Sequence, residues 1–470
     1  MNINNKNSIF FLVLVILSTT SCSKSFITQN PNGSISANLA ITDEASAQAA
    51  LNGVYQELTV PSLYGRDLIV IGDLLADNTF VETRNSGRYL PEFNYTITNS
   101  DGVFGEIWNA AYTAIMRANR LIDADVTGID QIKSQAYALR ALLYLKLLNI
   151  YSRPYTDAPS GYGVPLILHY DPSLLPTRDS ISKVYNQIIS DLTTAFNTAP
   201  DYTNSVTLSK YSIEGLLAKT YLYMGDYANA KTHAEDVIKN SGFKLTNGNT
   251  YLDFWHNPAV QTDKVEVMFE VDENSVNNNS SDDLGAMFYN GYSDIYATKE
   301  IDSLYSETDI RKKLLIDSST KSGASAYIVD KYINAGSSDK DNPKVIRLSE
   351  VYLIAAEASF GENSVSDAQT YLNDLATVRD PSITRYTSTG SQLLIDIVNE
   401  RRKELAFEGD RIYDLNRLKL EMNRGSLSSG SIPGPLSVPY SDYRRIAPIP
   451  LAEIQANQNI ADQQNPEYDK

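Results

Sequence analysis

The sequence contains few of the residues on which disulfides, zinc sites and strong stacking platforms depend. Its 470 residues include a single cysteine, Cys22, so an intramolecular disulfide is excluded. The three histidines, His169, His233 and His256, are too far apart along the chain to show metal-ligand spacing. Two tryptophans stand against 31 tyrosines, so any wet aromatic contact surface must be built mainly from tyrosine.

An excess of positive charge is also missing. The chain has 40 Lys and Arg against 57 Asp and Glu, which gives a net charge of −17. Nucleic-acid binding needs clustered basic residues for phosphate contacts, and no such cluster is present. The sequence also has no nucleophile elbow, no phosphate-binding loop and no dinucleotide fingerprint. These absences count against a nucleic-acid partner and against the common enzyme classes.

Long apolar runs are absent after the first residues. Residues 9–17 (IFFLVLVIL) form an unbroken apolar run that is too short to span a bilayer but fits a signal peptide. Small residues then lead directly to Cys22, as in a bacterial lipobox, although Thr19 stands where Leu is usual. We therefore predict a signal peptide at 1–21, lipidation of Cys22, and a polar tether over 22–42 that contacts the membrane only through the lipid.

Helical periodicity dominates the rest of the chain. Apolar residues recur at helical spacing in several segments, at 43–58, 104–122, 135–150, 184–196, 346–360, 365–378 and 393–407. Residues 212–240 show small residues at Ala-x-x-Tyr…Gly-Asp-Tyr-x-x-Ala spacing, which is similar to a tetratricopeptide helix pair. We expect a mainly α fold in which degenerate helix pairs form a superhelical frame over about 43–240 and 346–420, within one domain of residues 43–470.

A long irregular insertion interrupts this frame. Residues 245–341 are rich in Asn, Ser, Gly and Tyr, with a short alternating run at 265–271 that suits a strand. Because ligand contacts are often made by loops carried on a rigid frame, we expect this loop-rich region, with minor β structure, to bind the ligand.

An acidic cluster near the C-terminus invites comparison with a glycosidase, whose chemistry uses two carboxylates. The cluster comprises Glu400, Glu404, Glu408, Asp410 and Asp414. Three of these step by four along a predicted helix and are interleaved with arginines, a spacing that produces ion pairs between adjacent turns. We interpret the cluster as a structural salt-bridge network. We also expect Gly409 to end this helix and Asp410 to cap the next one.

The motifs resemble those of a known family. The most specific are RLSEVYLIAAEA at 347–358 and ERRKELAFEGDRIYDLNR at 400–417, joined by LNGVY at 51–55 and GDLLADN at 72–78. Together with the lipobox they resemble the SusD/RagB nutrient-binding outer-membrane lipoproteins of Bacteroidetes-type bacteria. Glu467 departs from the pattern, since such proteins often have Gly there.

The resemblance implies four degenerate tetratricopeptide-like helix pairs and a location in the outer membrane, facing the cell exterior. It also implies a partner, a SusC-like TonB-dependent barrel over which the protein acts as a lid. Its implied ligand is a nutrient such as a glycan; family members also handle peptides, so the ligand class stays open.

Aromatic rings and polar side chains in loops are the candidates for ligand contact, because a sugar has an apolar C–H face and hydroxyls that need hydrogen-bond partners. Two regions, 77–95 and 288–296, combine these residue types, with one tryptophan nearby in sequence. The candidate ligand-binding residues are Asn78, Arg84, Phe93, Tyr95, Trp255, Tyr289 and Tyr292. We expect their rings to be exposed and to converge on one surface, while Trp108 lies in a helical stripe and belongs to the core.

No cofactor is expected. Asp282-Asp283 and the segment 337–342 offer oxygen ligands that could hold a structural Ca²⁺, but a solvated loop is the preferred interpretation. The first functional hypothesis is a non-catalytic glycan-binding lipoprotein. A surface glycoside hydrolase and a peptide-binding tetratricopeptide-like scaffold are the alternatives; the first lacks a catalytic signature and the second leaves the long insertion unexplained.

Overall fold

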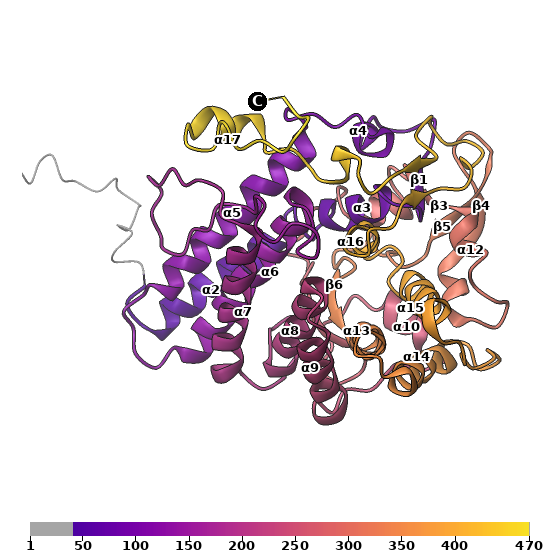
Figure 1. The fold of residues 1–470 in the computed structure, drawn as a ribbon, viewed down its shortest axis with the longest axis horizontal. Coiled ribbons are helices and arrows are strands. Elements are labelled where there is room, and N and C mark those ends of the chain that lie inside the picture. Colours follow the sequence, from indigo (N-terminus) through magenta and orange to yellow (C-terminus); the bar gives the residue numbers. More distant parts are fainter. Residues whose placement is uncertain (1–40, 470) are drawn as a thin grey trace, which may run out of the picture.

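Two layers make up the molecule, a frame of long helices and a smaller layer that contains strands (Figure 1). The structure is a computed structural model and describes residues 41–469. The predicted signal peptide, Cys22 and nearly all of the predicted tether lie outside the described residues. In Figure 1 the frame starts at α2, runs through α5 to α9 and continues into α13 to α15, while strands β1, β3, β4 and β5 lie together at the opposite end.

The frame confirms the predicted mainly α fold. Its helices are α2 (Glu44–Leu58), α5 (Gly102–Ile122), α6 (Asp130–Tyr151), α7 (Ile181–Thr198), α8 (Lys210–Met224), α9 (Tyr227–Asn240), α13 (Leu348–Gly361), α14 (Val365–Arg379) and α15 (Gly390–Glu404). Eight of these helices pack as four pairs, α2 with α5, α6 with α7, α8 with α9, and α13 with α14. Helix α13 also packs against α9 and α15. This succession is the superhelical frame expected from the sequence.

Local sequence explains how these helices begin and turn. Asp43 caps α2 by accepting a hydrogen bond from the Ser46 backbone N–H at 2.8 Å, and the Ser46 hydroxyl accepts one from the Asp43 N–H in return. Gly225 adopts a left-handed conformation (φ 74°) between α8 and α9, where Asp226 caps the second helix. The predicted helix–turn–helix at 212–240 is thereby confirmed.

The insertion is more ordered than the sequence indicates. Its strands are β2 (Val267–Glu270), β3 (Ile295–Ala297), β4 (Leu315–Ser319) and β5 (Ser325–Val329), and β6 (Lys344–Arg347) follows directly after it. Its short helices are α10 (Tyr251–His256), α11 (Leu284–Phe288), α12 (Lys299–Asp302) and η3 (Ile310–Leu314). Strand β1 (Thr79–Val81) joins them in a sheet of order β1-β3-β5-β4, and β2 pairs with β6. Much of the predicted loop region is therefore a packed layer.

The remaining short elements tie the two layers together. They are α3 (Asp67–Leu74), α4 (Leu90–Asn94), α16 (Arg411–Arg417), β7 (Met422–Asn423), β8 (Ser437–Val438), η4 (Tyr443–Arg445) and α17 (Leu451–Ala456). The C-terminal segment returns to the frame, where the Ala447 N–H donates to the Ile150 carbonyl and the Leu451 N–H to the Asn99 carbonyl. One large cluster of buried apolar side chains extends from Ala47 to Ile460 and passes through both layers.

Of two expectations about helix ends, the one for Gly409 is wrong and the one for Asp410 holds only for its position before α16. Helix α15 ends at Glu404, so Gly409 is not its cap; Gly409 has φ 80° and packs backbone to backbone against Gly72 of α3. A Cβ on Gly72 would lie 2.0 Å from the Gly409 carbonyl oxygen. Asp410 precedes α16 but makes no capping hydrogen bond, because its carboxylate instead pairs with Lys146 and Lys219.

Candidate ligand-binding face

Strand pairing brings two distant loops side by side. Strands β1 and β3 are antiparallel, with Val81 opposite Ile295, so the loop that leaves β1 lies beside the loop that enters β3. The Glu82 N–H donates to the Asp294 carbonyl at 2.9 Å and extends this pairing by one residue. Residues 82–88 and 289–294 therefore form one surface, although some 200 residues separate them in sequence.

Two buried carboxylates fix these two loops and also the loop that carries Lys321 and Ser322. Asp294 is fully buried and accepts hydrogen bonds from the Ser86 N–H (3.1 Å), the Ser86 hydroxyl and Lys321 Nζ (2.9 Å). Glu82 is also fully buried and accepts from the backbone N–H groups of Arg84 and Ser322. Charge-assisted hydrogen bonds of this kind are shorter and stronger than neutral ones, so the surface is held in place before any ligand arrives.

A tyrosine and an arginine lie at the centre of this surface. The guanidinium carbon of Arg88 is 3.9 Å from the centroid of the Tyr292 ring, and both side chains are half-buried. Arg88 is also oriented by the Ser86 hydroxyl, to which it donates at 3.1 Å. The exposed Arg84 donates to the Lys321 carbonyl at 2.9 Å. We call Arg84, Ser86, Arg88, Tyr292 and Lys321 the Tyr292 face.

The Tyr292 face suits a ligand that is apolar on one side and rich in hydrogen-bonding groups on the other. The Arg88 guanidinium lies over one face of the half-exposed Tyr292 ring, so a ligand meets the two side chains as one cation–ring pair. Guanidinium and ammonium groups are donors only, so they meet ligand groups that accept hydrogen bonds, such as hydroxyl oxygens.

Three of the seven predicted contact residues lie at this surface. Arg84 is exposed, and Tyr292 and Tyr289 are half-buried in the same short loop. The Tyr289 carbonyl accepts a hydrogen bond from the Ser293 hydroxyl at 3.4 Å, which fixes the turn between the two rings. Their role in ligand binding stays a prediction.

The aromatic residues of α4 and its C-terminus are buried, which corrects the prediction. Phe93 is 0% exposed and lies under the Arg424 guanidinium, 3.9 Å from its ring centroid. Tyr95 is 1% exposed; its hydroxyl donates to the Leu75 carbonyl, and burial raises its pKa to about 12. The C-terminal segment that carries Arg424 folds over both rings, so they cannot stack on a ligand.

Trp255 and Asn78 are buried as well. Trp255 is 2% exposed, with Lys331 Nζ 4.1 Å and Arg347 Cζ 5.2 Å from its ring centroid. Asn78 is 0% exposed; it donates to Asp73 at 2.7 Å and accepts from Arg402 Nε at 2.8 Å. Both residues are internal parts of the joint between the two layers. Trp108 is in the core, as predicted.

Sequence reasoning did not single out Ser86, Arg88, Lys321 or Asp294. Arg88 lies within the predicted segment 77–95, four residues after Arg84, and this proximity was a signal in the sequence. Lys321 is 237 residues from Arg84, so no local pattern connects the two. Only the pairing of β1 with β3, and of β3 with β5, brings these loops together.

The acidic cluster is a structural network, as predicted, but most of its ion pairs are not local. Glu404 is fully buried and contacts Arg311, Arg347 and Arg379, which come from three other elements. Burial alone would raise the pKa of Glu404, but the three guanidinium groups hold it well below its usual range. A general acid of a glycosidase needs the opposite shift.

The expected pairs between adjacent helical turns are in the minority. Within the cluster, local pairs join Lys403 to Glu400 and Arg417 to Asp414, whereas Arg402 and Arg411 turn away to Asp77. The network therefore joins distant segments of the chain to one another rather than stiffening a single helix.

Burial also raises the pKa values of several other carboxyls, Glu273 and Glu92 among the most strongly shifted. Burial, together with Asp283 and Asp272, raises the pKa of Glu273 to about 9. Burial and Asp101 raise the pKa of Glu92 to about 8. These side chains are 2% and 1% exposed, so neither can reach the glycosidic oxygen of a bound substrate.

The predicted oxygen ligands for calcium are occupied by protein groups. Asp282 pairs with Arg66, Asp283 with Lys340, and Asp341 accepts from Asn334. Within residues 41–469, no group of three or more His, Cys, Asp and Glu side chains is arranged to hold a metal ion. The same part of the chain contains no helix that is both long and apolar enough to cross a membrane.

Two family models match the chain. Residues 310–468 match a model described as the SusD family, and residues 36–222 match one described as starch-binding associating with outer membrane. Neither description is that of an enzyme.

Similar proteins agree with this assignment over nearly the whole length. A SusD-like protein P2 from Formosa agariphila is 28% identical, over 98% of this chain and all of that one. A SusD superfamily structure from Bacteroides thetaiotaomicron is 28% identical, with a TM-score of 0.82, over 91% of this chain and all of that one. A structure from Bacteroides vulgatus, described as a putative sugar binding protein, is 27% identical, with a TM-score of 0.83, over 92% of this chain and all of that one.

The fold is a frame of helix pairs that carries an inserted layer, and the Tyr292 face lies where this layer meets the segment that follows β1. The motifs, the two family models and the structural relatives identify the family. The chain belongs to the SusD/RagB-like family.

Proposed function

We propose that the protein binds a glycan at the Tyr292 face and delivers it, unchanged, to a SusC-like TonB-dependent barrel of the outer membrane. The observation that carries the proposal is the Arg88 guanidinium 3.9 Å from the Tyr292 ring centroid, on a surface held by buried carboxylates. Support comes from the family model described as starch-binding, and from the Bacteroides vulgatus relative described as a putative sugar binding protein.

The proposal includes an anchor and a single folded unit. Residues 1–21 act as the signal peptide, Cys22 carries the lipid, and 22–42 form the tether. Residues 43–470 fold as one domain, which the continuous apolar core through both layers supports. The protein then lies at the cell exterior, attached to the outer membrane through its lipid alone.

Neither alternative function accounts for the structure as well. A hydrolase needs an accessible acid with a raised pKa, whereas Glu404 is buried and its pKa is lowered. A peptide scaffold needs only the helix pairs, whereas the ordered layer over 245–341 presents a preorganised surface of its own.

A binding screen tests the first part of the proposal. The mature protein is run by affinity electrophoresis through gels that contain individual neutral and acidic polysaccharides. We expect at least one glycan to retard it, with no release of reducing ends on prolonged incubation. Release of product, or retardation by none of the glycans together with binding of peptides, would contradict the proposal.

The anchor and the partner are tested in the native host. Cys22→Ala should leave the protein unprocessed or free of the membrane, because acyl chains contribute about 0.8 kcal/mol per buried methylene. The wild type should co-purify with a TonB-dependent barrel after mild detergent extraction. A processed Cys22→Ala protein that remains in the membrane at high salt and alkaline pH would refute the lipid anchor.

A further inference from the structure

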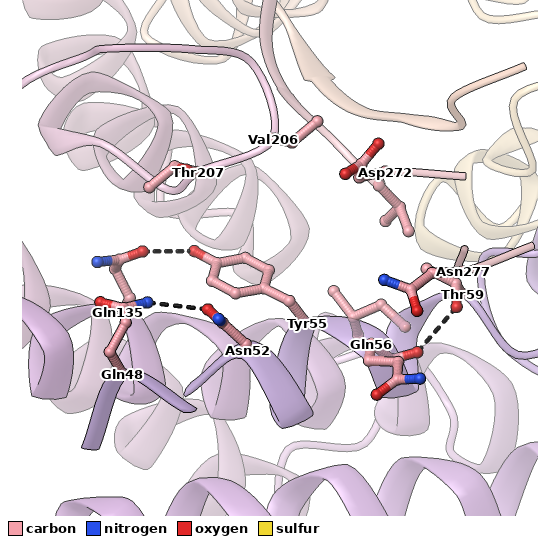
Figure 2. A pocket seen from close by; sticks show the side chains of 12 residues that line it. Gln48, Asn52, Tyr55, Gln56, Thr59, Gln135, Val206, Thr207, Asp272 and Asn277 are labelled. Atoms are coloured by element: carbon pink, nitrogen blue, oxygen red, sulfur yellow. Dashed lines mark hydrogen bonds between the residues drawn. The ribbon is translucent and has the colours of Figure 1, made fainter. Parts of the chain in front are cut away.

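A cavity lies on the helical frame and shares no lining residue with the Tyr292 face. One wall is the outward side of α2, and the other consists of the loop at 206–207 and the segment 271–277 that follows β2 (Figure 2). Its volume is about 450 Å³, within the range of small-molecule binding sites. Gln48, Asn52, Gln56 and Thr59 line it because they recur at three- and four-residue spacing along one side of α2.

Neutral hydrogen-bonding groups dominate this cavity. Five carboxamides line it, and each offers both a donor and an acceptor: Gln48, Asn52, Gln56, Gln135 and Asn277. The hydroxyls of Thr59 and Thr207 have the same dual character. The lining includes one charged side chain, Asp272, and no Lys, Arg or His.

A rigid aromatic ring forms part of the wall. The Tyr55 hydroxyl donates to Gln135 Oε1 at 2.8 Å and accepts from the Leu208 N–H at 3.0 Å, so the ring is fixed from both sides. The ring is half-buried, and its inner side packs toward Phe269, with 6.0 Å between centroids. A ring held in this way can accept an apolar ligand face without losing side-chain entropy on binding.

The acid is also held in place. Asp272 Oδ2 accepts from Asn274 Nδ2 at 2.7 Å, and the carboxylate lies on the wall opposite α2 (Figure 2). An uncompensated carboxylate repels anionic ligands and accepts hydrogen bonds from hydroxyls. The side chains of Gln56 and Asn277 approach from opposite walls, so a ligand between them meets both.

We propose that this cavity, the α2 pocket, is a second saccharide site that takes neutral, hydroxyl-rich sugars and rejects uronates and sulfated sugars. A sugar ring packs on Tyr55, and its hydroxyls exchange hydrogen bonds with Gln56, Asn277 and Asp272. The site shares no side chain with the Tyr292 face and stands independently of the function proposed for that face.

The test uses Tyr292→Ala protein, in which the Tyr292 face is impaired, and titrates it calorimetrically at millimolar concentrations. The probes are neutral hexasaccharides of glucose, xylose and mannose, with hexagalacturonate as the anionic probe. We expect at least one neutral probe to bind and hexagalacturonate not to bind. Adding Gln56→Leu should weaken the neutral probe three- to tenfold, since it removes one neutral hydrogen-bonding group.

The variants are chosen so that folding is retained. The Gln56 side chain is exposed, and the Thr59 hydroxyl donates to the backbone carbonyl of Gln56 rather than to its side chain. Gln56→Leu therefore leaves the helix intact. Gln392→Leu is the matched control, because Gln392 is an exposed glutamine on α15, outside the cavity. Asp272→Asn keeps the hydrogen bond from Asn274 but removes the charge, and should allow hexagalacturonate to bind.

Each result decides the question. Three- to tenfold weaker binding of the neutral probe on Gln56→Leu but not on Gln392→Leu, with binding of hexagalacturonate by the Asp272→Asn protein, supports the α2 pocket. Absence of neutral binding in the Tyr292→Ala protein, or equal binding with and without Gln56, overturns it. If Tyr292→Ala leaves saccharide affinity unchanged while Gln56→Leu lowers it, the Tyr292 face fails and the α2 pocket stands.

Discussion

The same residue types build two regions of this protein with opposite accessibility. Around Glu404, arginines lie over aromatic rings inside the molecule, where Arg347 Cζ is 5.2 Å from the Trp255 centroid and Arg379 Cζ is 4.7 Å from the Tyr251 centroid. At the Tyr292 face, an arginine lies over a ring at the surface. The inner rings are at most 2% exposed. The two regions contain the same pairs of side chains and differ in how far those side chains are exposed to solvent.

The buried region joins the two layers. Glu404 belongs to a helix of the frame, whereas Arg311 comes from the insertion and Arg347 from the strand that ends it. An ion pair with no access to water depends on every partner, because a charge left without its counterion stays desolvated. We therefore expect changes in this region to alter stability, and changes at the Tyr292 face to alter binding.

The largest expected effect is that of Glu404→Gln. The substitution keeps the shape but leaves three buried guanidinium groups without their shared carboxylate, which should lower the free energy of unfolding by about 3–5 kcal/mol. Urea unfolding followed by circular dichroism measures it. Glu307→Gln is the matched control, because Glu307 is 88% exposed and pairs with Lys312 at the surface, where such pairs contribute about 1 kcal/mol or less. Equal midpoints for the two variants would contradict a structural role for Glu404.

Trp255→Ala tests the same comparison with an aromatic residue. Removing a buried tryptophan should cost about 3–5 kcal/mol of unfolding free energy through lost packing and a cavity. Glycan affinity per folded molecule should stay within about twofold of wild type, because the ring does not reach the surface. Affinity is measured at low temperature, where the variant is folded. A stable Trp255→Ala protein with weakened glycan binding would indicate that Trp255 contacts the ligand after all.

A smaller effect on stability is expected from a second buried acid, Glu273. Glu273 lacks the arginine partners of Glu404, and burial, Asp283 and Asp272 raise its pKa to about 9 from 4.5. Its native state therefore holds a proton that the unfolded state releases, so unfolding free energy falls as pH rises from about 4.5 to 9.

Glu273→Gln removes this proton linkage. The variant should match wild type near pH 4 and exceed it by on the order of 1–3 kcal/mol at pH 9. Urea unfolding across this pH range measures the difference, with Glu307→Gln as the control. Parallel pH profiles for wild type and Glu273→Gln would show that Glu273 is charged in the native protein.

The helices of the frame could be predicted closely, because the periodicity of a helix is visible within a short stretch of sequence. The helix predicted at 365–378 corresponds to α14 at Val365–Arg379, and the turn at Gly225 could be predicted from the residues beside it. The sheet could not be predicted in the same way. Strand β1 is three residues long and pairs with β3 more than 200 residues away, so neither shows an alternating pattern long enough to detect.

The candidate site was predicted in part for the same reason. The composition of 77–95 and 288–296 pointed to two segments that strand pairing brings side by side. Their role in ligand binding stays a prediction. Which rings are covered depends on segments far away in sequence, such as Arg424 over Phe93 and Lys331 over Trp255. Exposure is a tertiary property, and no local spacing encodes it.

The most direct test of the central claim compares Tyr292→Ala with Tyr162→Ala. Tyr162 is 51% exposed, and Arg178 Cζ lies 5.3 Å from its ring centroid, so it is a similar cation–ring pair away from the proposed site. Both variants are titrated with the glycan that binds wild type most tightly in the screen. We expect at least tenfold weaker binding for Tyr292→Ala, about 1.4 kcal/mol, with a nearly unchanged melting temperature. Tyr162→Ala should keep wild-type affinity. Equal affinities for the two variants would contradict it.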